Sequence, residues 1–205
     1  MVKMSLGVYV HYPYCARHCP YCDFNVAVTR RVPHGQYADA VCAELRVRAQ
    51  DFMERPPAST VYFGGGTPGI WPAEHVARVL EAIDSSLGIA DGAEISLEFN
   101  PEDATHSRIK ALVDAGVNRV SLGVQSFNDG YLSVLGRRHD GAQAREAVQI
   151  ARGAGVQNLS IDLIHGMMGQ TLAEGLDDIS VAAALGPEHI STYQLTIEEK
   201  TAFGA

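Results

Sequence analysis

Three cysteines lie within eight consecutive residues near the start of the chain. Cys15, Cys19 and Cys22 have a C-x3-C-x2-C spacing within the stretch HYPYCARHCPYCDFN. Three thiols are an odd number for disulfides and one ligand too few for a closed four-ligand metal site. Iron–sulfur clusters are held by cysteine thiolates, and three of them on one loop can ligate three irons of a [4Fe–4S] cube. The fourth iron then keeps an open position for a substrate, as catalytic zinc sites keep one for water.

Other interpretations of the cysteine cluster stay open on the residues alone. His11 or His18 could complete a zinc site with the three thiolates. A group of buried structural thiols is disfavoured, because Pro13 and Pro20 make this segment a loop rather than part of the core. The remaining cysteine, Cys42, falls on the expected inner face of a helix, where a thiol behaves as a small buried hydrophobic group.

Further polar residues follow or interrupt short apolar runs later in the chain. The run at residues 60–63 leads into GGGTP, where glycines let a ligand approach the backbone closely; a plain tight turn uses the same residues. Glu98 and Asp162 each stand between two apolar neighbours. Parallel strands normally have two apolar faces, so a carboxylate there either points into a cavity or needs a buried partner. Gln125 and Arg137 could serve as capping or solvent-exposed residues.

Short apolar runs alternate with helical patterns along the whole sequence, which predicts an α/β fold with parallel strands and helical crossovers. An open doubly wound sheet and a barrel both satisfy this alternation, and six units without a reversal favour a partial (β/α)6 barrel of the TIM type. A complete eight-unit barrel takes about 250 residues, whereas this chain has 205 and shows no linker. We therefore expect one domain over residues 1–205. The predicted strands cover residues 8–11, 60–63, 94–99, 117–124, 159–164 and 189–195.

The carboxyl ends of these strands carry the polar residues described above. Active sites of such folds gather at that edge of the sheet. The cysteines follow the first predicted strand, GGGTP follows the second, and the other polar residues lie on or after later strands. The sequence therefore predicts one site that is shared by the cysteine loop and the strand ends.

Composition excludes some classes of function. The formal net charge is −8, with 46% hydrophobic and 20% charged residues, which argues against a large nucleic-acid-binding surface. No apolar run approaches the ~18 residues of a membrane span, and the N-terminal stretch lacks the pattern of a signal peptide. We therefore expect a cytoplasmic protein with no membrane span and no nucleic-acid partner, whose thiols stay reduced.

Together these motifs resemble the radical S-adenosylmethionine (SAM) superfamily, in which a C-x3-C-x2-C loop follows the first strand and a glycine-rich loop follows the second. More closely, the chain resembles the oxygen-independent coproporphyrinogen III oxidase family, and the match runs in order over nearly its whole length. The segments that carry it are YVHYPYCARHCPYCDFN, VYFGGGTP, EFNP, GVNRVSLGVQSFND, LGRRH, SIDLIHG and STYQLTIE.

The resemblance implies a radical SAM barrel with two cofactors. Cys15, Cys19 and Cys22 would hold a [4Fe–4S] cluster whose open iron binds SAM. One electron, delivered by a donor such as a flavodoxin or ferredoxin, would cleave SAM to methionine and a 5′-deoxyadenosyl radical. The SAM site implied by the motifs consists of Tyr9, Tyr21, Gly65, Gly66, Thr67, Glu98, Gln125, Arg137 and Asp162.

One position separates two branches of this family. True oxidases resemble C-x3-C-x2-C-x-C, whereas Phe24 occupies the last of these positions here. That residue matches the branch of heme chaperones, which bind heme and deliver it to respiratory enzymes. The resemblance therefore implies SAM as a ligand, heme as a further one, and a heme-accepting protein as a partner.

Three alternatives accompany this interpretation. The first is decarboxylation of coproporphyrinogen III in porphyrin biosynthesis, which the absent fourth motif cysteine disfavours. The second is a radical tRNA-modifying enzyme, which the acidic balance disfavours. The third is an inactive truncated fragment, because the family's C-terminal domain, with its His-Asn-x-x-Tyr-Trp motif, is absent from this sequence. Without that domain we expect the sixth strand to be an exposed edge.

Overall fold

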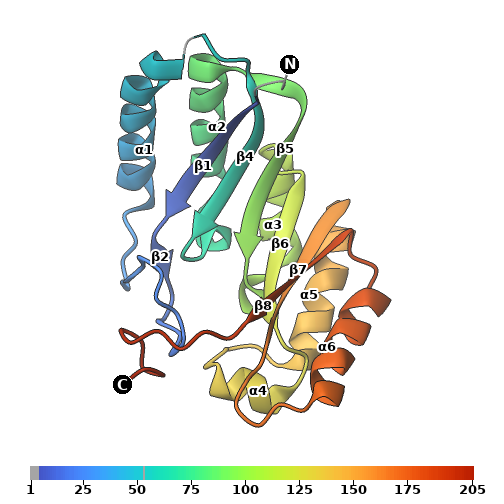
Figure 1. The fold of residues 1–205 in the computed structure, drawn as a ribbon. Coiled ribbons are helices and arrows are strands. Elements are labelled where there is room, and N and C mark those ends of the chain that lie inside the picture. The colour runs from blue at the N-terminus through green and yellow to red at the C-terminus, as the bar shows by residue number, and fades with distance from the viewer. Residues whose placement is uncertain (1–4, 53) are drawn as a thin grey trace.

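The computed structural model describes residues 5–52 and 54–205, which build a parallel six-stranded sheet with crossover helices packed along one face (Figure 1). The spatial order of the strands is β1-β4-β5-β6-β7-β8. Their bounds are β1 Leu6–Tyr12, β4 Ala58–Gly65, β5 Ile89–Phe99, β6 Arg119–Gln125, β7 Asn158–His165 and β8 His189–Gln194. The main helices are α1 His34–Arg48, α2 Ala73–Leu87, α3 His106–Asp114, α5 Gly141–Gly153 and α6 Leu172–Ala184.

Strand order decides between the two predicted architectures. A doubly wound sheet reverses its order at a switch point, whereas here each large strand lies beside the one that precedes it in the chain. Right-handed crossovers that always advance in one direction place every helix on the same side of the sheet. The partial (β/α)6 barrel is therefore confirmed. Within the described residues, β1 and β8 are its edges, and β8 is largely exposed, as predicted.

The ends of the helices follow local chemistry that the sequence makes visible. The Thr105 side chain accepts a hydrogen bond from the first turn of α3, and Asp140 and Thr171 form reciprocal capping boxes on α5 and α6. Such caps satisfy backbone N–H groups that a helix cannot pair itself. Gly116 has a φ of 112° after α3, a conformation that glycine adopts without a Cβ clash.

The two faces of the sheet differ in chemistry. Val61 and Phe63 of β4 are fully buried against the helices, while Tyr62 between them is only half-buried on the other face. The same alternation holds on β7, where Asp162 lies between the buried Ile161 and Leu163. The expectation that both faces are normally apolar therefore holds here only for the helix-covered face, because the other face forms a polar, concave surface.

Several short elements were not predicted from the sequence. β2 (Tyr14–Cys15) and β3 (Ala27–Val28) pair in parallel, so the two ends of the cysteine loop lie together. A hydrogen bond of 2.7 Å from the Ala27 backbone N–H to the Pro13 carbonyl supports this pairing. The remaining short elements are η1 Ala49–Phe52, η2 Pro68–Ile70, η3 Pro101–Asp103 and α4 Asp129–Val134.

Candidate cofactor site

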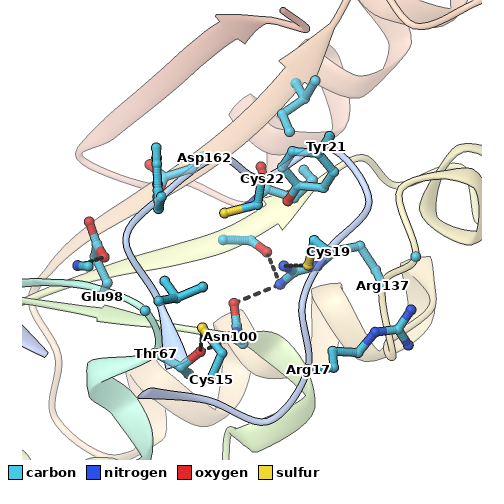
Figure 2. A pocket seen from close by; sticks show the side chains of 18 of the residues that line it. Cys15, Arg17, Cys19, Tyr21, Cys22, Thr67, Glu98, Asn100, Arg137 and Asp162 are labelled. Atoms are coloured by element: carbon cyan, nitrogen blue, oxygen red, sulfur yellow. Dashed lines mark hydrogen bonds between the residues drawn. The ribbon is translucent and has the colours of Figure 1, made fainter. Parts of the chain in front are cut away.

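A cavity of about 460 Å³ lies between the cysteine loop and the carboxyl ends of the strands (Figure 2). Every residue predicted for the cluster and the SAM site lines it, except Tyr9. These residues come from the first loop and from four different strand ends, so the fold brings together groups that are up to 147 positions apart (15 to 162). The lining residues among the predicted set are Cys15, Cys19, Tyr21, Cys22, Gly65, Gly66, Thr67, Glu98, Gln125, Arg137 and Asp162.

The three cysteines face this cavity as free thiols. The Cys15 sulfur accepts a hydrogen bond from the Thr67 hydroxyl at 3.6 Å, and the Cys19 sulfur lies 3.9 Å from an Arg137 nitrogen. Burial raises the pKa of the Cys15 and Cys22 thiols, so binding a metal here must displace protons from them. Donors placed at two of the sulfurs suit thiolates that carry negative charge.

The arrangement of the sulfurs bears on the type of metal centre. Within residues 5–52 and 54–205, no group of three His, Cys, Asp or Glu side chains converges on a single ion. A [4Fe–4S] cube binds each thiolate to a different iron, so thiols distributed around one cavity fit it. The His11 Nε2 donates to the Asn25 carbonyl at 3.0 Å and its Nδ1 lies 3.3 Å from the Tyr9 hydroxyl, while His18 lies against the Cys19 carbonyl. Neither histidine lines the cavity, so the zinc arrangement is not formed here.

The glycines after β4 are required by close packing against the start of the cysteine loop. A Cβ on Gly66 would lie 2.7 Å from the Tyr14 carbonyl oxygen, and Gly65 has a φ of 118°. The Thr67 backbone N–H donates to the same Tyr14 carbonyl at 2.9 Å. These contacts bring the Thr67 side chain to Cys15, so the glycine-rich segment joins the cluster loop to the rest of the site rather than forming an isolated turn.

Two carboxylates point from the concave face of the sheet into the cavity (Figure 2). Glu98 accepts hydrogen bonds from the Tyr62 hydroxyl at 2.8 Å and from the Gly65 backbone N–H at 3.1 Å. Asp162 accepts from the Ser121 hydroxyl, at 3.0 and 2.8 Å to its two oxygens. Burial raises the pKa of both carboxyl groups. Each has a donor within the protein and retains acceptor capacity for a ligand.

Arg137 is the most enclosed charge of the site, with only 6% of its side chain exposed. Its Nη2 donates to the Asn100 side-chain oxygen at 2.7 Å and to the Gly123 carbonyl at 3.0 Å, and it lies 3.7 Å from Glu102. Its Nε is buried without a hydrogen-bond partner among the described residues. An unpaired buried donor costs free energy, so this nitrogen is suited to an acceptor on a ligand.

Glu102 and His139 form the layer behind Arg137. The His139 Nδ1 lies 2.9 Å from the Glu102 carboxylate, and its Nε2 donates to the Val124 carbonyl at 3.0 Å. Burial alone raises the pKa of Glu102, but the hydrogen bond with His139 and the charge of Arg137 together lower it to about 2. Glu102 is therefore ionised near neutral pH and balances the buried guanidinium.

Gln125 has an unusual backbone conformation. Its φ of 70° makes it the non-glycine residue with a positive φ in the described part of the chain. Its side-chain nitrogen would lie 2.9 Å from a Cβ on Gly123, and the Asn100 side-chain oxygen would lie 3.3 Å from that atom. The absence of a side chain at Gly123 thus lets the two amides and Arg137 converge on one part of the cavity wall.

The two predicted tyrosines differ in their placement. Tyr21 lines the cavity, and burial raises the pKa of its hydroxyl to about 12. Tyr9 is 59% exposed and does not line the cavity. Its ring stacks on Tyr62, with 6.0 Å between centroids, so its contact with the site passes through that residue. A role for Tyr9 in binding SAM stays a prediction.

The structure adds residues to the site that the predicted SAM set did not include. Tyr62 and Ser121 could have been found from the alternation of polar and apolar residues on their strands, and Asn100 follows the strand end that carries Glu98. The segment after β8 could not, because it returns to the cysteine loop (Figure 1) and its Phe203 N–H donates to the Pro20 carbonyl at 3.0 Å. This segment contributes Leu195, Thr196 and Glu198 to the cavity wall.

Comparison with known proteins identifies the family. The family model of the radical SAM superfamily matches residues 9–181 of the sequence. The chain belongs to the radical SAM superfamily. That membership implies a [4Fe–4S] cluster and SAM as cofactors, and the site described above has the donor set for both. Within residues 5–52 and 54–205, no helix combines the length and the hydropathy that a membrane crossing needs.

The relatives support the branch suggested by Phe24. The chain is 41% identical over 202 residues to heme chaperone HemW from Haemophilus influenzae and 39% identical over 207 residues to HemW from Escherichia coli. These alignments cover 97% and 100% of the chain but 53% and 54% of the relatives, so it spans about half of their length. The resemblance to the heme chaperone branch is therefore confirmed.

A solved structure supports the fold. Coproporphyrinogen III oxidase (HemN) from E. coli, described as a radical SAM enzyme, matches with a TM-score of 0.87 at 30% identity. The match covers 98% of this chain and 47% of that one. The parallel-strand partial barrel of this chain is therefore shared with this enzyme.

Proposed function

We propose that this chain is the cofactor-binding core of a heme chaperone of the HemW type, which holds a [4Fe–4S] cluster on Cys15, Cys19 and Cys22 and binds SAM beside it. The observation that carries the proposal is the single cavity where three free thiols meet the polar strand ends. When bound, the cluster supplies the electron for reductive cleavage of SAM. A cluster on these thiolates needs reduced cysteines, so a reducing compartment such as the cytoplasm is part of the proposal.

The residues around the cavity suit the functional groups of SAM. The unpaired Nε of Arg137 can donate to its carboxylate. Glu98 and Asp162, each already held by a hydroxyl of the protein, can accept from amine or ribose hydroxyl groups. The buried Glu102 keeps the guanidinium of Arg137 in place. These groups would orient SAM against the loop that holds the cluster.

Heme is the proposed cargo because the relatives named above are heme chaperones and because Phe24 occupies the position that separates the two branches. Phe24 is 64% exposed and Tyr193 is 58% exposed, and both line the same cavity. Exposed aromatic rings can stack on a flat macrocycle. A heme-accepting protein and a one-electron donor such as a flavodoxin or ferredoxin are the partners this function requires.

Decarboxylation of coproporphyrinogen III is the second candidate, favoured by the match to HemN. Phe24 occupies the position of the fourth motif cysteine in that branch, and the identity to the HemW proteins is higher. An anaerobic assay with coproporphyrinogen III, SAM and reductant separates the two. We expect no decarboxylated product.

Anaerobic reconstitution with iron and sulfide tests the cluster assignment. We expect about four irons per chain, and none in the triple variant in which Cys15, Cys19 and Cys22 are replaced by alanine. Cys42→Ala is the matched control, because this thiol is buried against the helices and should load fully. Heme titration of the loaded protein then tests the cargo by its absorption spectrum. Stoichiometric zinc uptake without iron would overturn the cluster assignment.

A further inference from the structure

The turn after β6 holds the strained residue of the site. Gln125 ends β6 with a φ of 70°. A non-glycine residue is less favourable in this left-handed region than in the right-handed one, because its Cβ comes too close to the following carbonyl oxygen. Such a conformation persists only where surrounding contacts impose it. The next two residues show which contacts do so.

Asp178 of α6 binds both residues that follow Gln125. The Ser126 hydroxyl donates to one carboxylate oxygen at 2.7 Å, and the Phe127 backbone N–H donates to the other at 2.7 Å. Ser126 is fully buried and Asp178 is 5% exposed. The Ser126 oxygen in turn accepts from the Asn128 N–H at 3.1 Å. One carboxylate from a distant helix therefore fixes the path of the chain through this turn.

Packing of α6 alone does not account for a carboxylate at this position. Among the described residues, Asp178 forms no ion pair with a basic side chain. A buried charge without a counter-ion is unfavourable unless hydrogen bonds compensate it. An apolar residue would attach α6 to the core without that penalty. The two hydrogen bonds that the carboxylate accepts from the turn therefore explain why an acidic residue occupies this position.

We propose that Asp178 is a positioning residue of the SAM site: it holds the turn that keeps Gln125 in its left-handed conformation and its amide over Gly123. The inference rests on the proposed function, with Gln125 taken as the SAM-site residue that the family resemblance implies and that lines the cavity. Asp178 itself does not line the cavity and acts only through the turn.

Asp178→Asn is the direct test. An asparagine presents an N–H₂ group to one of the two donors, so one hydrogen bond is lost while the size of the side chain is kept. We expect SAM to bind about tenfold more weakly to the reconstituted protein, which corresponds to one lost buried hydrogen bond. Iron loading should stay at the wild-type value. Hydrogen exchange at the Phe127 amide should become faster, a readout that needs no cofactor.

A double-mutant cycle separates positioning from general stability. Gln125→Gly removes the amide and accepts a positive φ without strain, and we expect it to weaken SAM binding by itself. Adding Asp178→Asn to this background should change the SAM dissociation constant by less than twofold, because the positioned side chain is gone. An unchanged tenfold effect in that background would overturn the proposal.

Two further variants keep the test decisive. Ser126→Ala removes the hydroxyl's hydrogen bonds with Asp178 and with the Asn128 N–H but keeps the bond from the Phe127 N–H to the carboxylate. It replaces Asp178→Asn if that protein does not fold, and a loss of SAM affinity is again expected. Asp140→Ala, which removes the exposed cap of α5, should lower the melting temperature without changing SAM affinity. Wild-type affinity in both Asp178→Asn and Ser126→Ala contradicts the inference. A wild-type protein that binds no SAM contradicts the proposed function instead, and the exchange rate at Phe127 still tests the turn.

Discussion

The cysteine loop and the Arg137 side of the cavity are built in opposite ways. Ala16, Arg17 and His18 are exposed, and the Cys22 N–H donates to the Cys19 carbonyl at 3.1 Å as one of few backbone bonds in the loop. On the other side, Arg137 and Glu102 are almost fully buried and hydrogen-bonded on several sides. The wall around Arg137 is therefore formed by the fold itself, whereas the cysteine loop, which has few backbone hydrogen bonds, can adjust to a cluster.

The largest effect should follow from removing the charge of Glu102. Glu102→Gln leaves the guanidinium of Arg137 buried without its balancing carboxylate. Breaking one partner of a buried ion pair costs about 3–5 kcal/mol. We expect the free energy of unfolding at pH 7 to fall by about 3 kcal/mol, measured by urea denaturation. A loss below about 0.5 kcal/mol is typical of surface positions. Such a value would contradict the view that the Arg137 side of the cavity is more firmly packed than the cysteine loop.

Lowering the pH should abolish most of the stability difference between the wild type and Glu102→Gln. The folded pKa of Glu102 is about 2, below its ordinary value of 4.5. A depressed carboxyl pKa contributes stability that is complete above pH 4.5 and is lost as the pH falls towards 2. The stability gap between wild type and Glu102→Gln should therefore narrow over this range. Urea denaturation from pH 7 to pH 3 measures it, and a gap independent of pH is incompatible with the assigned shift.

A smaller loss of stability is expected from a substitution at Gly123, beside which the side-chain amides of Gln125 and Asn100 converge. Gly123→Ala places a Cβ 2.9 Å from the Gln125 amide nitrogen, so that amide or Asn100 must move. We expect about tenfold weaker SAM binding and ~1–2 kcal/mol lower stability, the range for overpacking. Calorimetric titration of the loaded protein gives the affinity. Gly155→Ala is the control, since no atom lies within 4 Å of its Cβ position; with a φ of 98° it should lower stability only.

The smallest effect on stability belongs to the cysteine loop. Phe24→Ala changes a side chain that is 64% exposed, and exposed positions usually change stability by less than ~0.5 kcal/mol. We expect unchanged stability and iron loading but weaker heme binding, measured by absorption titration. A stability loss above 1 kcal/mol would show that the loop is as firmly packed as the Arg137 side.

The sequence predicted the elements and part of the site for physical reasons. Apolar runs bordered on one side or the other by glycine or proline revealed all six large strands, and polar residues inside those runs, such as Glu98 and Asp162, revealed the concave face. The layer behind the site was not predicted. Glu102 and His139 are 37 positions apart, and Asp178 is 51 positions from Phe127. No local periodicity encodes such pairs, which form only when the sheet has ordered its loops.

Tyr9 was predicted for the SAM site from the family motifs, but the structure places it outside the cavity wall. Alternation along β1 places it on the concave face, opposite the buried Val10. Its strand is an edge, however, and the ring covers Tyr62 instead of lining the cavity. Strand identity and face could be predicted from the sequence, but the distance of this edge from the cavity depends on the curvature of the whole sheet.

The electron paramagnetic resonance spectrum of the reduced, reconstituted protein, recorded with and without SAM, tests the central claim most directly. Three cysteine ligands leave one iron open, so the account predicts a cluster signal that changes when SAM binds and that loses this response in Arg137→Met while iron loading is retained. A cluster signal that SAM leaves unchanged, or a protein that loads zinc and no iron, would contradict the account.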